Sequence, residues 1–269
     1  MKKLLYLFSA TLLVFTSCSS DDANSSDSAS MILPKSVKYT SPSYPSDNSN
    51  STISYDGNKI ISIKSEDGRT DYVYDGNVIV KTTDYDAAGN KDSEAIYTYA
   101  VGKLAGYSYA ENFTSKFPTG EYKTRTAYTY NSDGTIKTLY YTTDVTTGVE
   151  SKTNNERLST ISNGNLVKVV EINSTPGSSV YTTVYEFDAK NNPTKNIAGF
   201  NLLAITDEGF GSINNIVKST SSSVDMSTNT SNTNVYKTVY VYDANGYVTK
   251  ETSYENDGTT VDGITEYTY

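Results

Sequence analysis

The chain has 269 residues and a net charge of −9, from 22 basic and 31 acidic side chains, and it contains no histidine, no tryptophan and one cysteine. These absences exclude catalytic Ser-His-Asp and Cys-His arrangements, and zinc sites that need several histidine or cysteine ligands. The acidic balance disfavours nucleic acid as a partner, because a phosphate backbone would be repelled. We expect no cofactor and no bound metal, since the sequence has no P-loop, no GxGxxG segment and no acidic turn with calcium-loop spacing.

Residues 1–17 predict a secretory signal peptide. Lys2 and Lys3 precede the apolar run LLYLFSATLLVF, which is shorter than the ~20 apolar residues that span a bilayer. The run ends at Thr16-Ser17-Cys18, and small residues before a lone cysteine resemble a lipoprotein cleavage box. We expect a diacylglycerol on Cys18 that anchors the protein to a membrane. An ordinary cleaved signal with an incidental cysteine is the alternative.

Residues 18–33 predict a lipidated, flexible tether. The stretch SSDDANSSDSAS is polar and acidic, and it cannot bury enough apolar surface to offset the entropy lost on ordering. Its SSDD segment resembles the export tag of Bacteroidetes surface lipoproteins, which implies a lipid-anchored protein on the outer face of the outer membrane. A generic linker on a periplasm-facing lipoprotein is the alternative. Loss of Lys2 and Lys3 leaves 20 basic against 31 acidic residues, a net charge of −11 that suits a cell-surface protein.

Residues 34–269 predict a single all-β domain built from a hairpin repeat. The repeat is an aromatic or isoleucine, any residue, an aromatic, a turn and an aliphatic residue. Copies begin at Ile53, Tyr72, Tyr97, Tyr128, Tyr185 and Tyr240, with a degenerate copy at Ile161. Tyr, Val, Ile and Thr favour strands, and Asp-Gly or Asn-Gly pairs favour hairpin turns. Because a flat sheet of about a dozen or more strands would curl, we expect a curved antiparallel β-meander or half-barrel.

Residues 191–234 predict an insertion in this domain. Asn191–Ser219 shows no two-residue alternation, and Gly199–Ile205 predicts one or two helical turns that plug or cap one face of the sheet. Ser221–Asn234 predicts a surface loop. Since a specific site needs groups that a repeat does not supply, the candidate binding residues belong to this segment. They are Phe200, Asp207, Glu208 and Phe210.

The phrase Tyr-x-Tyr-Asp-x-x-Gly resembles the YD repeat of Rhs toxins and teneurins, whose repeats wind into a β-sheet shell. Tyr240, Tyr242, Asp243 and Gly246 fit it. Over nearly its whole length the chain resembles Bacteroidetes YD-repeat-like surface lipoproteins, which carry a lipoprotein box, tyrosine-rich hairpins and a late segment NPxKNIxGF. Asn192–Phe200 matches that segment. The resemblance implies a lipidated β-sheet protein of the cell surface, and it carries no activity over to this chain.

The function that follows from these patterns is a non-catalytic, surface-anchored module that binds or adheres to a glycan, a peptide or another envelope protein. Two alternatives stay open. One is a structural envelope component without a ligand, and the other is a carboxylate-based glycan-active enzyme, for which Asp207-Glu208 would need a second facing acid. We expect most tyrosines to pack within the sheet, where a cross-strand pair contributes ~0.2–1 kcal/mol.

Overall fold

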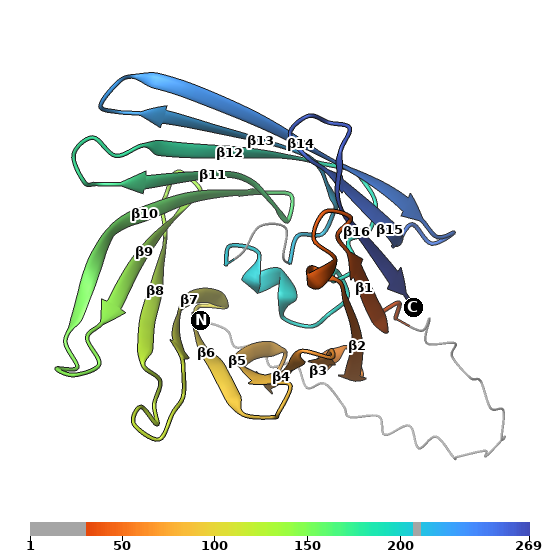
Figure 1. The fold of residues 1–269 in the computed structure, drawn as a ribbon, viewed down its shortest axis with the longest axis horizontal. Coiled ribbons are helices and arrows are strands. Elements are labelled where there is room, and N and C mark those ends of the chain that lie inside the picture. The colour runs from red at the N-terminus through yellow and green to blue at the C-terminus, as the bar shows by residue number, and fades with distance from the viewer. Residues whose placement is uncertain (1–30, 207–210) are drawn as a thin grey trace, which may run out of the picture. The chain divides into compact units, whose positions relative to one another are not determined.

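A computed structural model describes residues 31–206 and 211–269, which form a closed barrel of 16 antiparallel strands (Figure 1). The strands are β1 (Ser36–Thr40), β2 (Ser49–Asp56), β3 (Lys59–Lys64), β4 (Gly68–Asp75), β5 (Val78–Asp86), β6 (Lys91–Ala100), β7 (Lys103–Glu111), β8 (Tyr122–Tyr130), β9 (Thr135–Thr143), β10 (Glu150–Ser162), β11 (Asn165–Asn173), β12 (Val180–Phe187), β13 (Ile216–Asp225), β14 (Thr230–Tyr242), β15 (Val248–Tyr254) and β16 (Val261–Thr268). Two short 3-10 helices, η1 (Pro45–Asp47) and η2 (Phe200–Leu203), interrupt them.

The all-β antiparallel prediction is confirmed, but the predicted open or half-barrel sheet is wrong. Strand β1 pairs with β16, with Ser36 opposite Thr268, and this pairing closes the ring. Closure satisfies the backbone groups that the two edge strands of an open sheet would leave unpaired. The signal peptide, Cys18 and the predicted binding residues Asp207, Glu208 and Phe210 lie outside the described residues. Within the described part, no helix is long and apolar enough to cross a membrane.

The two ends of the barrel differ in their connections. At one end, which we call the short-turn end, two-residue turns such as Gly57-Asn58 and Gly76-Asn77 join the repeat hairpins. At the other end, the long-loop end, the connections include 41–48, 112–121 and 255–260. Both the start of the described chain and its last residue lie at the short-turn end, where the backbone N–H of Lys35 donates to the Thr268 carbonyl.

The tyrosine repeat builds a bulged hairpin. The pairing register shifts at the second aromatic residue of several repeats, including Tyr55, Tyr74, Tyr99 and Tyr242. A bulge adds one residue to the return strand and re-aims the side chains beside it. The aliphatic residue that follows the turn consequently faces inward. The side chains at this position are at most 1% exposed, and they belong to Ile60, Ile79, Leu104, Leu166 and Val248.

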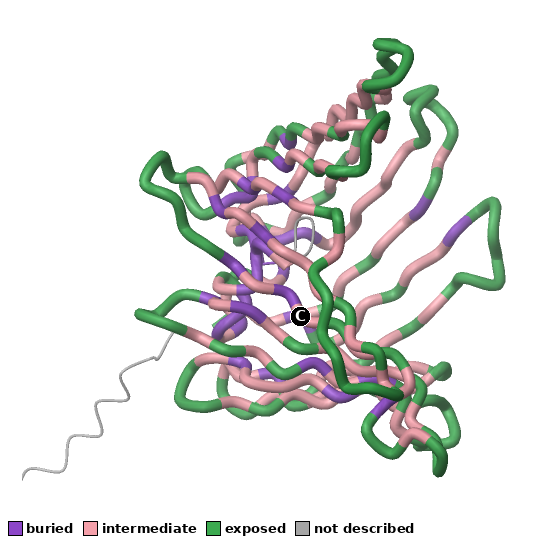
Figure 2. The backbone as a smooth tube through the Cα atoms, turned by 90° about the vertical axis from the view of Figure 1, so that its left-hand side faces the viewer, coloured by how far each residue is buried: buried purple, intermediate pink, exposed green. Residues whose placement is uncertain are grey.

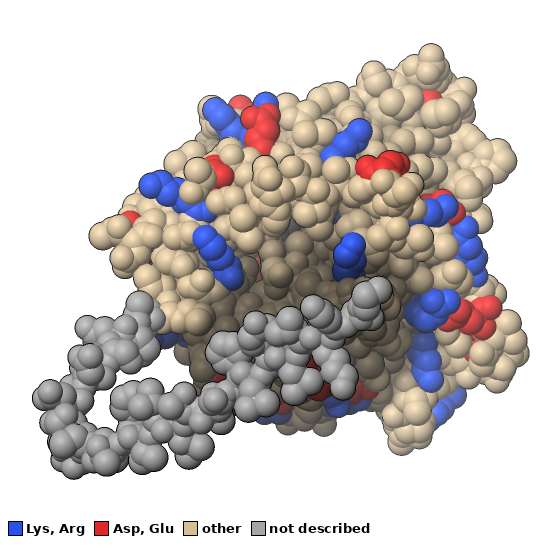
Figure 3. Space-filling model, turned by 180° about the vertical axis from the view of Figure 1, so that it is seen from behind, with Lys and Arg blue, Asp and Glu red and all other residues tan. Residues whose placement is uncertain are grey.

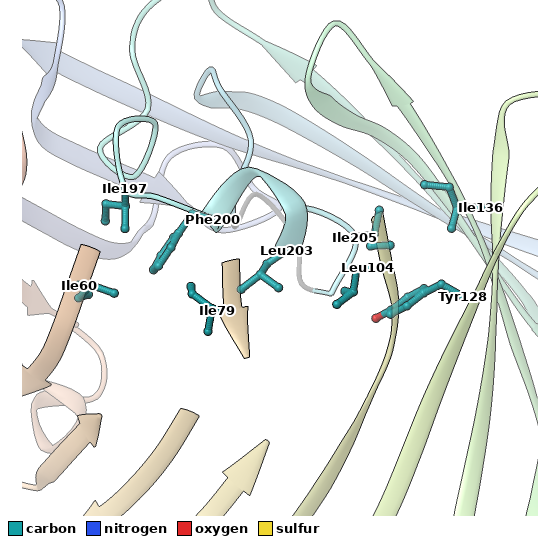
Figure 4. Close-up of a cluster of buried hydrophobic side chains, with 9 residues drawn as sticks. All are labelled: Ile60, Ile79, Leu104, Tyr128, Ile136, Ile197, Phe200, Leu203 and Ile205. Atoms are coloured by element: carbon teal, nitrogen blue, oxygen red, sulfur yellow. The ribbon is translucent and has the colours of Figure 1, made fainter. Parts of the chain in front are cut away.

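The connection between β12 and β13 folds into the barrel at the short-turn end (Figure 1). We call its described residues, 188–206 and 211–215, the plug. Ile197, Phe200, Leu203 and Ile205 are 1–4% exposed and pack against the inward aliphatic residues of the wall, as Figure 4 shows. In Figure 2 the buried residues cluster in the interior of the barrel, and the residues of the outlying loops are exposed. The predicted plug over one face of the sheet is thus confirmed.

The insertion is shorter than predicted. Residues 216–225 and 230–242 form β13 and β14, so the segment Ser221–Asn234 lies in the barrel wall rather than in a surface loop. Its serines and threonines form a regular ladder, with Ser222 opposite Thr182 on one side and Thr233 on the other. Small hydroxyl side chains fit a half-exposed pleated surface, and a composition that suggests a loop is compatible with a strand once neighbouring strands supply the hydrogen bonds.

Candidate functional site: the barrel lumen

Strand alternation separates the basic side chains between the two faces of the wall. Buried Ile79 and Tyr128 mark the inward face, and residues directly opposite one another in the ladder share a face. The basic strand residues that this register turns outward are Lys38, Lys59, Lys64, Arg69, Lys81, Lys91, Lys103, Lys123, Arg125, Lys137, Lys152, Lys168, Lys218, Lys237 and Lys250. Among the described strands, Arg157 is the basic residue that faces inward, opposite Thr138 and Glu171.

Several acidic residues of the described strands face the lumen. Asp84 lies opposite Ser93, Glu111 opposite Tyr122, Glu171 opposite Tyr181 and Glu251 opposite Tyr240. With Arg157 as the counterpart, the inner wall carries an excess of negative charge. A cavity lined by one sign of charge focuses its field and concentrates counter-ions.

The outer wall carries ion pairs between different strands. Measured between nitrogen and oxygen, the Arg125–Glu150 contact is 2.6 Å, Lys137–Glu156 is 2.8 Å, Lys218–Glu186 is 2.7 Å and Lys81–Glu94 is 3.4 Å. Lys and Arg side chains lower the pKa of Glu150 and Glu156, as expected for carboxylates held beside cations. Figure 3 shows such basic and acidic side chains distributed over the face it presents.

These outward charges make the outer wall a poor match for lipid. A membrane-embedded barrel presents an apolar band ~25 Å tall, and an outward Lys or Arg at mid-depth costs about 2–4 kcal/mol. Outward valines do occur on β12 and β14, where Val184, Val239 and Val241 are 42–55% exposed. The same region also carries Glu186 and Lys218, so these valines do not form an uninterrupted apolar band.

Toward the long-loop end, the lumen keeps open space. A cavity of about 320 Å³ lies against β9–β12. Its lining includes the inward residues Tyr140, Asn155, Arg157, Glu171, Asn173 and Tyr181. Small-molecule sites span ~300–1,000 Å³, so this volume suits a small organic solute. Tyr181 is 53% exposed, which shows that solvent reaches its side chain.

Two of the lumen carboxylates are held by neighbouring hydroxyl groups. The Thr70 and Ser93 hydroxyls donate to Asp84 over 2.6 Å and 2.5 Å. The Tyr109 hydroxyl donates to Glu111 over 2.9 Å. Hydrogen bonds of this kind stabilise the charged form of a carboxylate. Asp84 and Glu111 therefore already have hydrogen-bond partners within the barrel wall.

Glu251 differs from these two carboxylates. It is mostly buried, and within 31–206 and 211–269 no hydrogen-bond donor or cation contacts its carboxylate. Burial raises its pKa above the usual glutamate value, because desolvation penalises the charged form. Burial likewise raises the pKa of Tyr240 and Tyr267, and the nearby Glu251 charge adds to both shifts. Glu251 therefore lies in an aromatic part of the lumen wall without an internal counter-charge.

The structure places one predicted binding residue in the core. Phe200 is 2% exposed, and its ring centroid lies 6.2 Å from that of Tyr72. The roles proposed for Asp207, Glu208 and Phe210 fall outside the described residues, and the binding role of the group stays a prediction. Sequence reasoning missed Glu251, although strand alternation in VTKETSY puts Lys250 and Glu251 on opposite faces. Among the described residues, no cluster of three or more His, Cys, Asp or Glu side chains could hold a metal ion.

The chain resembles two solved porin-like structures. A porin-like protein from Bacteroides vulgatus ATCC 8482 has a TM-score of 0.59 and 14% identity, covering 89% of this chain and 99% of that one. A porin-like protein from Bacteroides uniformis ATCC 8492 has a TM-score of 0.48 and 11% identity, covering 87% of this chain and 97% of that one. No protein-family model and no curated protein matches the chain. The first similarity shows that this chain has the fold of a porin-like β-barrel.

This finding corrects two sequence predictions. The assignment to YD-repeat-like surface lipoproteins is wrong, because the repeats close into a porin-like barrel rather than a YD shell. The predicted adhesion module for a glycan, peptide or envelope partner is corrected as well, because the chain has the fold of a porin-like barrel and not that of an open binding sheet. In line with the expectation that most tyrosines pack, Tyr72, Tyr97 and Tyr128 lie in or against the core cluster inside the barrel.

Proposed function

We propose that the protein is a porin-like barrel of the outer membrane that admits small solutes into its lumen through one end. The supporting observation is the division of the lumen. Phe200, Leu203 and Ile205 of the plug are buried at the short-turn end, while a cavity of about 320 Å³ remains toward the long-loop end. The proposal involves no chemical step on the solute.

We further propose that a lipid on Cys18, rather than the barrel wall, holds the protein at the outer membrane, with the barrel on the cell surface. The interstrand ion pairs on the outer wall support this arrangement, since insertion would bring several charges into lipid. The described chain enters the barrel at the short-turn end, where Pro34 accepts a hydrogen bond from Tyr55. The open half of the lumen lies toward the opposite end.

Solute entry can be tested by cysteine labelling. In a chain that carries Cys18→Ser, Tyr181→Cys places a thiol in the lumen cavity, and Thr182→Cys places one on the outer wall of the same strand. A small methanethiosulfonate should label both thiols, whereas a large polyethylene glycol maleimide should label the outer thiol alone. Failure of the small reagent at position 181, or equal labelling of both thiols by the large one, would overturn the proposal.

A transmembrane channel is the second candidate. The strand number favours it, because barrels of 16–18 strands enclose an aqueous channel in porins. The plug and the charged outer wall count against it. In planar bilayers we expect no conductance steps from the intact protein. Stepwise conductance that disappears with heat-denatured protein would replace the first proposal with this one.

A further inference from the structure

We infer that the lumen recognises solutes that carry an ammonium group, with Glu251 as the carboxylate that binds the cation and Tyr240 and Tyr267 as flanking aromatic rings. This inference rests on the proposed entry of solutes, and it names their chemical class. The ligand it describes is a small organic cation whose apolar part packs on tyrosine rings.

The register brings these three side chains to one place on the inner wall. Glu251 on β15 lies directly opposite Tyr240 on β14 and Thr265 on β16. Tyr267 follows Thr265 by two residues, so it shares the face and is a diagonal neighbour of Glu251. Diagonal neighbours lie ~7–8 Å apart, within reach of aromatic side chains.

The hydroxyl groups of neighbouring tyrosines donate hydrogen bonds to groups other than Glu251. The Tyr240 hydroxyl donates to the Ile216 carbonyl over 2.8 Å, and the Tyr242 hydroxyl donates to Asp188. Lys250, the next residue along β15, lies on the outer face opposite Glu266. Within the described residues, the carboxylate of Glu251 therefore has no donor or cation to offset its desolvation. A buried carboxylate is costly unless it is paired, so the arrangement favours either a proton or an incoming cation at this position.

The surroundings suit an organic ammonium better than a bare metal ion. A metal ion needs several oxygen ligands, whereas the neighbours of Glu251 on the inner face include the aromatic residues Tyr240, Tyr242 and Tyr267. Tyrosine faces attract ammonium groups through their quadrupoles and also pack against the attached apolar groups. Further inward carboxylates, including Asp84, Glu111 and Glu171, add a field that draws cations into the lumen.

Choline is a suitable probe, and 3,3-dimethyl-1-butanol is its neutral counterpart of the same shape. In titration calorimetry on the intact barrel, choline should bind saturably, and the neutral alcohol should bind about tenfold or more weakly because it lacks the charge. Glu251→Gln should weaken choline binding by about tenfold or more while leaving binding of the alcohol unchanged. Glu266→Gln is the matched control, since Glu266 lies outward on β16 and pairs with Lys38.

A second readout separates ligand pairing from a structural role. If choline pairs with the carboxylate, binding near the raised pKa of Glu251 must release a proton, and the affinity must fall as the solution is acidified. The titratable groups that face Glu251 are Tyr240, Tyr242 and Tyr267, whose pKa values are all raised, so they stay protonated in this range. Calorimetry in two buffers of different ionisation enthalpy measures the released protons, and Glu251→Gln should abolish the release.

The outcomes are distinct. Equal affinity for choline and the neutral alcohol, or full choline affinity in a folded Glu251→Gln variant, would overturn the cation inference. Normal thiol labelling at position 181 without choline binding would overturn it while leaving solute entry intact. Failure of that labelling would remove both proposals. Thermal unfolding with tyrosine fluorescence checks that each variant is folded.

Discussion

At the residue scale, the second tyrosine of a repeat joins one hairpin to its neighbour. The Tyr99 hydroxyl donates to the Ile79 carbonyl over 2.7 Å, Tyr130 to Leu104 over 3.1 Å, and Tyr269 to Val248 over 2.9 Å. Each acceptor is the buried aliphatic residue that follows a turn on the preceding strand. Bulges disrupt the ladder locally, so a phenol hydroxyl can satisfy a carbonyl there that the strands leave unpaired.

Removing one of these hydroxyls should destabilise the barrel. Tyr99→Phe deletes the bond to the Ile79 carbonyl and should lower the free energy of unfolding by about 1 kcal/mol. Tyr122→Phe serves as control, because Tyr122 is 55% exposed and should change stability much less. Urea unfolding of the three proteins gives the comparison, and equal midpoints for all of them would contradict the structural role of the hydroxyl.

Glu251 should make stability depend on pH. Its folded-state pKa is raised, so its contribution is present below the unfolded value of about 4.3 and is lost as the pH rises through the folded-state pKa. The Glu251→Gln variant has no charge to desolvate, and its stability advantage over the unmodified protein should grow as the pH rises above about 4. Urea midpoints across this range measure it, and parallel pH profiles for the two proteins would show that Glu251 is not desolvated.

At the scale of elements, the plug contributes apolar side chains that the wall cannot supply for itself. The barrel is too wide for inward residues from opposite walls to meet, and η2 brings Phe200 and Leu203 against Ile79 and Leu104 (Figure 4). The plug thereby fills the short-turn end, and the inward aliphatic residues of the repeats form a hydrophobic core with it. The apolar side chains of the plug and of the repeats bury one another.

Truncation inside the plug should therefore be costly. Leu203→Ala removes a side chain that is 1% exposed and should lower the free energy of unfolding by about 2–5 kcal/mol. Asn201→Ala, in the same 3-10 helix but exposed, should have little effect. Urea unfolding measures both variants. A small loss for Leu203→Ala would mean that the barrel does not depend on the plug for stability.

At the scale of the whole molecule, the charge distribution separates this barrel from a lipid-embedded one. Outward lysines and glutamates form pairs across strands, while the lumen holds Asp84, Glu111, Glu171 and Glu251. Tyrosine rings lie largely inside. Polar groups outside and aromatic groups inside are the pattern of a wall that faces water, which is why we propose that a lipid on Cys18 attaches the protein to the membrane.

Membrane attachment should therefore depend on the thiol. Cys18→Ser should move the protein from the membrane fraction to the soluble fraction, because ion pairs such as Arg125–Glu150 and Lys137–Glu156 interrupt the apolar surface of the outer wall. Fractionation followed by immunoblotting checks this, with Tyr122→Phe as a variant that should remain attached. A Cys18→Ser protein that stays with membranes after a high-salt wash would show that the wall itself inserts. Protease treatment of intact cells then distinguishes the cell surface from the periplasm.

Much of the local structure was predictable from neighbouring residues. The hairpin at Asp56-Gly57-Asn58 follows from turn chemistry, and Gly57 adopts the positive φ of 60° that glycine tolerates. The interruption near Gly199 marked the plug because it breaks the two-residue alternation. The candidate residues were harder to place. Phe200, a predicted binding residue, packs its apolar ring against Tyr72 in the core, and its binding role stays a prediction.

By itself, the sequence determined that this protein would be built from tyrosine-rich hairpins with an irregular insertion, because turns and strand alternation depend on residues a few positions apart. Only the tertiary structure decided that the sheet closes and which face becomes the lumen. Closure pairs Ser36 with Thr268, 232 positions apart, and no local pattern specifies a contact of that separation. Once the ring is closed, strand alternation places Lys250 on the outer face and Glu251 on the inner face of β15. The closure of the barrel thus makes Glu251 a carboxylate of the lumen.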